Sequence, residues 1–168
     1  MASQDYEEFI AALNAHGVRY LVVGAHAVAF YARPRATKDL DILIEPTPTN
    51  ARRVLAALRD FLGGADLGYC EEDVTDPRWI IQLGVAPVRI DLISEIPGFA
   101  NFKVAWKHRV DARFGSVQAH YIGLDELLGA KGAAARPQDR ADLRILKRAK
   151  SGAPLTTRSS RRRKTRRG

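Results

Sequence analysis

Apolar residues recur along the chain at two different spacings, and each spacing predicts one kind of element. Helical spacing predicts a first helix that ends before Gly17 and further helices over residues 25–32, 50–62, 99–106, 125–135 and 137–150. Short runs of apolar and β-branched residues predict strands over residues 18–23, 40–44, 79–83, 88–93, 109–114 and 117–122. Residues 63–77 are mostly polar and contain glycine, so they are predicted to form a loop.

The order of these elements predicts the fold class. Residues 84–87 separate two of the strands and are few enough for a hairpin, which gives, with the two earlier strands, a mixed sheet of about four strands. The strands over 109–114 and 117–122 are expected to form a second hairpin beyond that sheet. We therefore expect an α/β (α+β) fold, in which a small mixed sheet is flanked by helices and followed by C-terminal helices.

Composition is that of an ordinary globular domain. The chain has 168 residues, of which 46% are hydrophobic and 27% are charged. The single cysteine, Cys70, excludes an internal disulfide. No apolar run is long enough to cross a membrane, and the first eight residues do not resemble a signal peptide, so we expect a cytoplasmic protein without membrane contact.

The net charge of +8 is concentrated at the C-terminal end. Residues 151–168 contain seven basic residues and no acidic ones, which leaves 20 basic and 19 acidic residues in positions 1–150. We interpret 1–150 as the folded domain and 151–168 as a basic tail too polar to fold alone. The tail is either a solvated extension or a salt-dependent contact to RNA or DNA. Trp79 and Trp106 are assigned to the core rather than to base stacking.

Three aspartates are candidates for chemistry. Asp39 and Asp41 alternate with apolar residues on a predicted strand, so their side chains share one face, where a divalent cation would relieve their repulsion. Oxygen ligands favour magnesium or manganese over zinc. Asp91 lies within an otherwise apolar strand, and if the two strands are neighbours, the three acids could hold metal ions for phosphoryl displacement. A solvated strand edge is the alternative for Asp39 and Asp41.

Gly24 lies between a predicted strand and a predicted helix. A glycine there permits a close turn and presents the free N–H groups of the helix start to an anion such as phosphate. A phosphate-binding turn together with metal-binding carboxylates points to a nucleoside triphosphate and its magnesium ion.

This pattern resembles the minimal nucleotidyltransferases of the DNA polymerase β superfamily, whose signature Gly24, Asp39, Asp41 and Asp91 match. Residues 23–42 are similar to toxins of the AbiEii/AbiGii type from bacterial toxin–antitoxin and phage-defence systems. The later motif of that group, a lysine followed by Arg-x-x-Asp-x-x-Asp, matches further residues, and the resemblance covers roughly residues 18–146. The matching positions of the toxin group are Arg35, Thr37, Lys131, Arg136, Asp139 and Asp142.

The resemblance implies transfer of a nucleoside monophosphate from an NTP, such as ATP, to an acceptor hydroxyl with release of pyrophosphate. It implies that Asp39, Asp41 and Asp91 bind Mg²⁺ or Mn²⁺ and act in catalysis. The acceptor would be a tRNA, a protein or a small molecule such as an aminoglycoside, and a toxin of this type would have a cognate antitoxin. The implied nucleotide-binding residues are Gly24, Ala25, Arg35, Thr37 and Lys131, with Arg136 and Asp139 in support.

Several observations leave other interpretations open. Ala25 stands where the family has glycine or serine, which removes a hydroxyl that could bind phosphate. The alternative function is therefore a non-catalytic module of the same fold that binds nucleic acid or a protein partner. Lys131 can equally be an exposed helix lysine, and Arg136, Asp139 and Asp142 can be weak ion pairs on a helix surface.

Overall fold

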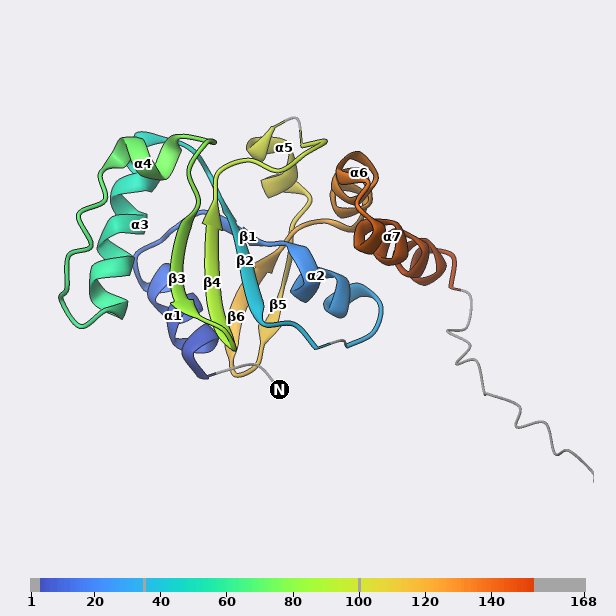
Figure 1. Ribbon diagram of the computed structural model, residues 1–168, viewed down its shortest axis with the longest axis horizontal. Coiled ribbons are helices and arrows are strands. Elements are labelled where there is room, and N and C mark those ends of the chain that lie inside the picture. The colour runs from blue at the N-terminus through green and yellow to red at the C-terminus, as the bar shows by residue number, and fades with distance from the viewer. Residues whose placement is uncertain (1–3, 35, 100, 153–168) are drawn as a thin grey trace, which may run out of the picture.

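The computed structural model describes residues 4–34, 36–99 and 101–152 (Figure 1). Within these residues, six strands form one mixed sheet in the order β3-β4-β2-β1-β6-β5. The strands are β1 (Tyr20–Val22), β2 (Asp39–Ile44), β3 (Ile81–Val85), β4 (Val88–Ile93), β5 (Val110–Phe114) and β6 (Val117–Tyr121). The α/β fold class predicted from the sequence is confirmed.

The sheet is larger than predicted because the second hairpin belongs to it. Strand β6 pairs parallel with β1, with Val22 opposite Tyr121, and β5 pairs antiparallel with β6. Strands β2 and β4 are also parallel, whereas β1–β2 and β3–β4 are antiparallel. A parallel pairing between strands far apart in the sequence leaves no local pattern, so the expectation of about four strands was wrong.

Helices cover both faces of the sheet (Figure 1). Helices α1 and α3 pack on one face, in a core that includes Phe9, Val54 and Ile42. Helices α2, α5, α6 and α7 pack on the other face, in a core that includes Leu43, Leu127 and Leu146. The helices are α1 (Gln4–Ala15), α2 (Gly24–Tyr31), α3 (Pro48–Phe61), α4 (Glu71–Thr75), α5 (Phe102–Lys107), α6 (Leu124–Ala134) and α7 (Pro137–Lys150).

Two local predictions were wrong. The stretch 63–77 contains the short helix α4, whose start is capped by Asp73, which accepts a 2.9 Å hydrogen bond from the backbone N–H of Cys70. Because α4 buries only Val74, it has no apolar periodicity to reveal it. Trp79 is 59% exposed and precedes β3. It lies in a turn, where its backbone N–H donates a hydrogen bond to the carbonyl of Asp76. Trp106 is half-buried at the edge of the second core, as predicted.

Across the described part of the chain, every helix is too short or too polar to span a membrane.

Candidate active site

The register of the sheet brings the three predicted aspartates to one face. Strand β2 lies directly beside β4, and Asp41 is the register partner of Asp91. Asp39 precedes Asp41 by two residues on β2, so its side chain points to the same face. This is the face that α2, α5, α6 and α7 cover, because Leu43 on the same side of β2 packs in their core. The structure thus brings together acids that are 50 residues apart in the sequence.

Asp41 has an unusual electrostatic environment. Burial raises the pKa of its carboxyl to about 6, and the negative charges of Asp91 and Asp39 act in the same direction. The positive charges of Lys131 and Arg89 oppose this rise without cancelling it. A half-buried carboxylate that is insufficiently compensated by the protein has an affinity for additional positive charge.

Gly24 packs directly against Asp41. Its φ of +62° is in the left-handed region, and a Cβ at this position would lie 2.2 Å from Asp41 Oδ2. The N–H of Val23 donates a 3.0 Å hydrogen bond to the carbonyl of Asp41, which fixes the turn between β1 and α2 on the strand. Only glycine meets both requirements, so the turn and the acid form one unit.

Lys131 is held in place by two acids of α7. Its Nζ lies 3.0 Å from Asp139 Oδ1 and 2.9 Å from Asp142 Oδ2, and its side chain is only 11% exposed. Arg136 Nε makes a 2.8 Å contact with Asp139 Oδ2. Burial acts to raise the pKa of Asp139, but hydrogen bonds from Arg136 and Lys131 outweigh it and lower that pKa. Lys131 is therefore not an exposed helix lysine. Asp139 and Asp142 are buried rather than on the helix surface, whereas the Arg136 side chain is 77% exposed.

One cleft of about 610 Å³ contains most of the predicted site residues. A smaller pocket of about 150 Å³ adjoins it and adds apolar side chains from α6 and the β4–α5 connection. Thr37 lines the cleft, but its hydroxyl exchanges hydrogen bonds with the backbone of Asp39. Arg35 lies outside the described residues, as do residues 153–168 of the basic tail. The residues that line the cleft are Gly24, Ala25, Thr37, Asp39, Asp41, Lys131, Arg136, Pro137, Gln138 and Asp139.

Residues 2–165 match a family model described as nucleotidyl transferase of unknown function (DUF2204). The chain belongs to this family. No curated protein matches the chain significantly. The family description agrees with the class of protein predicted from the sequence, whereas the AbiEii/AbiGii grouping stays a prediction.

Arg89 is a residue of the site that the sequence analysis missed. Its Nη2 lies 2.9 Å from Asp39 Oδ2 and 3.5 Å from Asp91 Oδ2. Gln82 also donates a 3.0 Å hydrogen bond to Asp91 Oδ1. The signal was available, because Arg89 precedes Asp91 by two residues and alternation places both on one face of β4.

The donors suit a hard divalent cation, but they are not gathered around one. Asp41 and Asp91 are carboxylates on neighbouring strands in register, and the pKa of Asp41 is raised first by burial and then by the charges of Asp91 and Asp39. Carboxylate oxygens of this kind fit Mg²⁺ or Mn²⁺. With Arg89 placed between Asp39 and Asp91, no three acidic, histidine or cysteine side chains of the described residues converge as a metal site.

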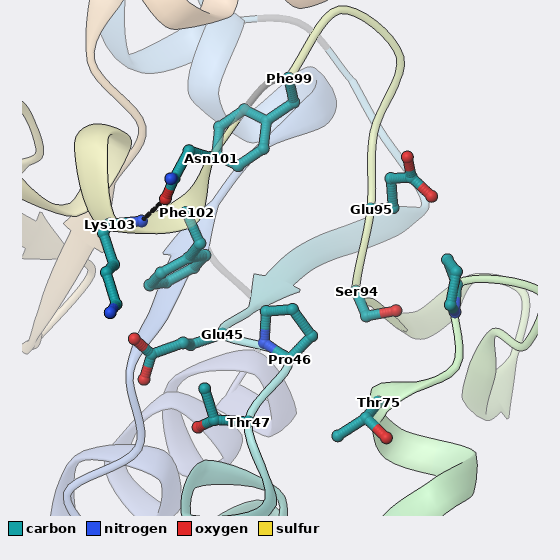
Figure 2. Close-up of a pocket in the computed structure, with 11 residues that line it drawn as sticks. Glu45, Pro46, Thr47, Thr75, Ser94, Glu95, Phe99, Asn101, Phe102 and Lys103 are labelled. Carbon is teal, nitrogen blue, oxygen red and sulfur yellow. Dashed lines mark hydrogen bonds between the residues drawn. The ribbon is translucent and has the colours of Figure 1, made fainter.

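A separate pocket of about 390 Å³ lies beyond the carboxyl ends of β2 and β4 (Figure 2). Glu45 and Ser94, which follow these two strands, line it together with the rings of Phe99 and Phe102. None of the predicted site residues lines this pocket. The chemistry predicted from the sequence therefore belongs to the cleft lined by Asp39 and Asp41, which we call the aspartate cleft, and not to this pocket.

Proposed function

We propose that this nucleotidyl transferase moves a nucleoside monophosphate from an NTP to an acceptor hydroxyl, with Mg²⁺ or Mn²⁺ as cofactor and pyrophosphate as the second product. The observation that supports this most is that Asp39 and Asp41 line one cleft with Gly24 and Lys131. Asp91, which does not line the cleft, is the register partner of Asp41 on the neighbouring strand.

The three aspartates and Gly24 each have a chemical role in this proposal. Asp39, Asp41 and Asp91 would hold the divalent cation, which when bound stabilises the negative charge that develops on the phosphate oxygens. Asp91 accepts the proton of the attacking hydroxyl, because it is the acid on the strand facing Asp41. Gly24 supplies the turn that lets a phosphate approach the start of α2.

Lys131 binds the triphosphate in this proposal. Lys131 lines the same cleft as Asp41, and its Nζ is held by Asp139 and Asp142 at 3.0 Å and 2.9 Å. Because the contacts to α7 remove the freedom of a long side chain, less conformational entropy is lost when phosphate binds. Arg136 and Asp139 support this arrangement through their own ion pair.

For the acceptor we favour RNA, because seven basic residues of the tail follow the domain. A protein hydroxyl and a small molecule such as an aminoglycoside are the other acceptors that fit the same chemistry. If the protein acts as a toxin, a cognate antitoxin is its expected protein partner.

One observation favours a second candidate function, a non-catalytic module that binds nucleic acid or a protein. This observation is that Arg89 forms ion pairs with two of the three acids. Ala25, where the resembling nucleotidyltransferases have glycine or serine, agrees with it because alanine offers no hydroxyl to a phosphate. A protein of this kind would keep the fold without needing free carboxylates.

Thermal unfolding with added Mg²⁺ and NTP separates the two functions, because a ligand that binds only the folded state raises Tm. We expect Mg²⁺ with NTP to raise Tm in the natural protein, Asp41→Asn to abolish the rise, and Asp66→Asn, an exposed acid on the α3–α4 connection, to leave it unchanged. A rise with pyrophosphate formation on adding RNA or lysate protein supports the transferase. No rise at millimolar Mg²⁺ would contradict it.

A further inference from the structure

We infer that Arg89 is an internal counter-cation that occupies the aspartate site in the metal-free protein, and that the site gains a divalent cation by displacing its guanidinium group. This inference rests on the proposed function. It assigns to Arg89 the control of how tightly the site binds metal.

The contacts of Arg89 place its positive charge among the acids. Arg89 is the register partner of Asp39 across β2 and β4, and Asp91 lies two residues further along its own strand. A single nitrogen, Nη2, faces both Asp39 and Asp91, at 2.9 Å and 3.5 Å. Among the described residues, the Arg89 ion pairs include these two acids and not Asp41. The guanidinium therefore takes the carboxylate oxygens that a metal ion would use.

Arg89 is held less firmly than Lys131, a basic residue that lines the cleft. Lys131 reaches two carboxylates at 2.9 Å and 3.0 Å with 11% of its side chain exposed. The side chain of Arg89 is 35% exposed, and one of its two contacts is long. Its Nε is buried with no hydrogen-bond partner within the described part of the chain. An unpartnered buried donor costs free energy, so this position of Arg89 depends on attraction to the two acids.

Charge balance favours exchange of the guanidinium for a metal ion. Asp39, Asp41 and Asp91 carry three negative charges beside the single positive charge of Arg89, which leaves excess negative charge on this face of β2 and β4. A divalent cation compensates more of that charge than a guanidinium does, and two cations cannot share the same oxygens without strong repulsion. Because Arg89 is partly exposed, its long side chain can move toward solvent without disrupting either core.

The test measures Mn²⁺ binding to the full chain without nucleotide, by titration calorimetry. Removing the competing charge in Arg89→Met should tighten Mn²⁺ binding at least about tenfold, whereas Arg89→Lys should stay close to the natural protein. Arg113→Met is the matched control, because Arg113 lies on β5 and bonds the carbonyl of Ser116. Arg89→Gln makes the same test if the methionine variant does not fold.

Binding by Arg89→Met that is equal to or weaker than that of the natural protein would overturn the inference, because Arg89 would then orient the acids for the metal. If Asp41→Asn still abolishes Mn²⁺ binding in that case, the proposed function survives. If neither the natural protein nor the Arg89 variants bind Mn²⁺, the proposed function fails as well.

Nuclear magnetic resonance gives an independent readout of displacement. The Nε–H signal of Arg89, assigned by its loss in Arg89→Lys, should shift when Mg²⁺ is added to the natural protein, because Nε leaves its buried position. An unchanged signal at a Mg²⁺ concentration that raises Tm would contradict displacement.

Discussion

Asp41 is partly buried beside two other acids, and ionising its carboxyl there lowers the free energy of unfolding. Its carboxyl has a pKa of about 6 in the folded protein against an ordinary value of 3.8. The folded state therefore binds this proton more tightly than the unfolded state does. The resulting loss of stability is absent below about pH 4, develops as the pH rises toward 6, and is complete above pH 6.

We predict that Asp41→Asn stabilises the protein at pH 7.5 by up to about 3 kcal/mol, because the amide does not ionise. At pH 4 the natural carboxyl is already protonated, so the gain should nearly vanish. Urea unfolding at both pH values measures the two free energies of unfolding. Equal changes in the free energy of unfolding at pH 4 and pH 7.5 would show that the pKa of Asp41 is not raised in the folded protein.

Gly24 is predicted to be intolerant of a side chain. Gly24→Ala combines the cost of a positive φ with a clash against Asp41, whereas Gly17→Ala has the same kind of φ and open space around the new Cβ. We expect Gly17→Ala to destabilise by about 1 kcal/mol and Gly24→Ala by about 2–4 kcal/mol, as measured by urea unfolding. Equal losses would mean that Asp41 moves aside without cost.

At the scale of elements, alternation along a strand was the strongest sequence signal. It predicted that Asp39 and Asp41 share a face, and the pairing of β2 with β4 brought Asp91 beside them. Alternation also places Arg89 and Asp91 on one face of β4, but the Arg89 contacts were missed because only the acids of the strands were considered. The pairing of β1 with β6 was not predictable, because it depends on packing across the whole sheet.

Helices α6 and α7 are joined by a buried ion cluster, which we define as Lys131, Asp139 and Asp142. Lys131→Met should destabilise the protein by about 3 kcal/mol, because it removes the ammonium group that two buried carboxylates share. Lys150→Met is the control, since it removes an exposed pair with Asp125 and should cost less than about 1 kcal/mol. Urea unfolding measures the free energy of unfolding of both variants. A similarly small loss of stability in Lys131→Met and Lys150→Met would contradict a structural role for the cluster.

At the scale of the whole molecule, both cores are built from described residues between Tyr6 and Leu146. The sequence predicted the fold class and nearly every element within these limits, because each core helix has an apolar face. It could not predict the extent of the sheet or the burial of the ion cluster, since both arise from contacts between distant segments.

We predict that deleting residues 153–168 leaves Tm unchanged and weakens RNA binding. The deletion removes seven basic residues, so the slope of log affinity against log salt concentration should fall by about 0.7 for each lost contact to single-stranded RNA. Filter binding across a salt series measures this slope. An unchanged affinity and slope would place any RNA contact on the domain instead.

The central claim is that the aspartate cleft transfers nucleotides, and the most direct measurement is label transfer from α-labelled NTPs. The purified protein is incubated with each of the four NTPs, Mg²⁺, and total bacterial RNA or lysate protein, alongside Asp41→Asn and the control Asp66→Asn. We predict that label appears on one class of macromolecule with the natural protein and with Asp66→Asn, and not with Asp41→Asn. Label that persists in Asp41→Asn, or no transfer to any acceptor by a protein that binds Mg²⁺ and NTP, would contradict the claim.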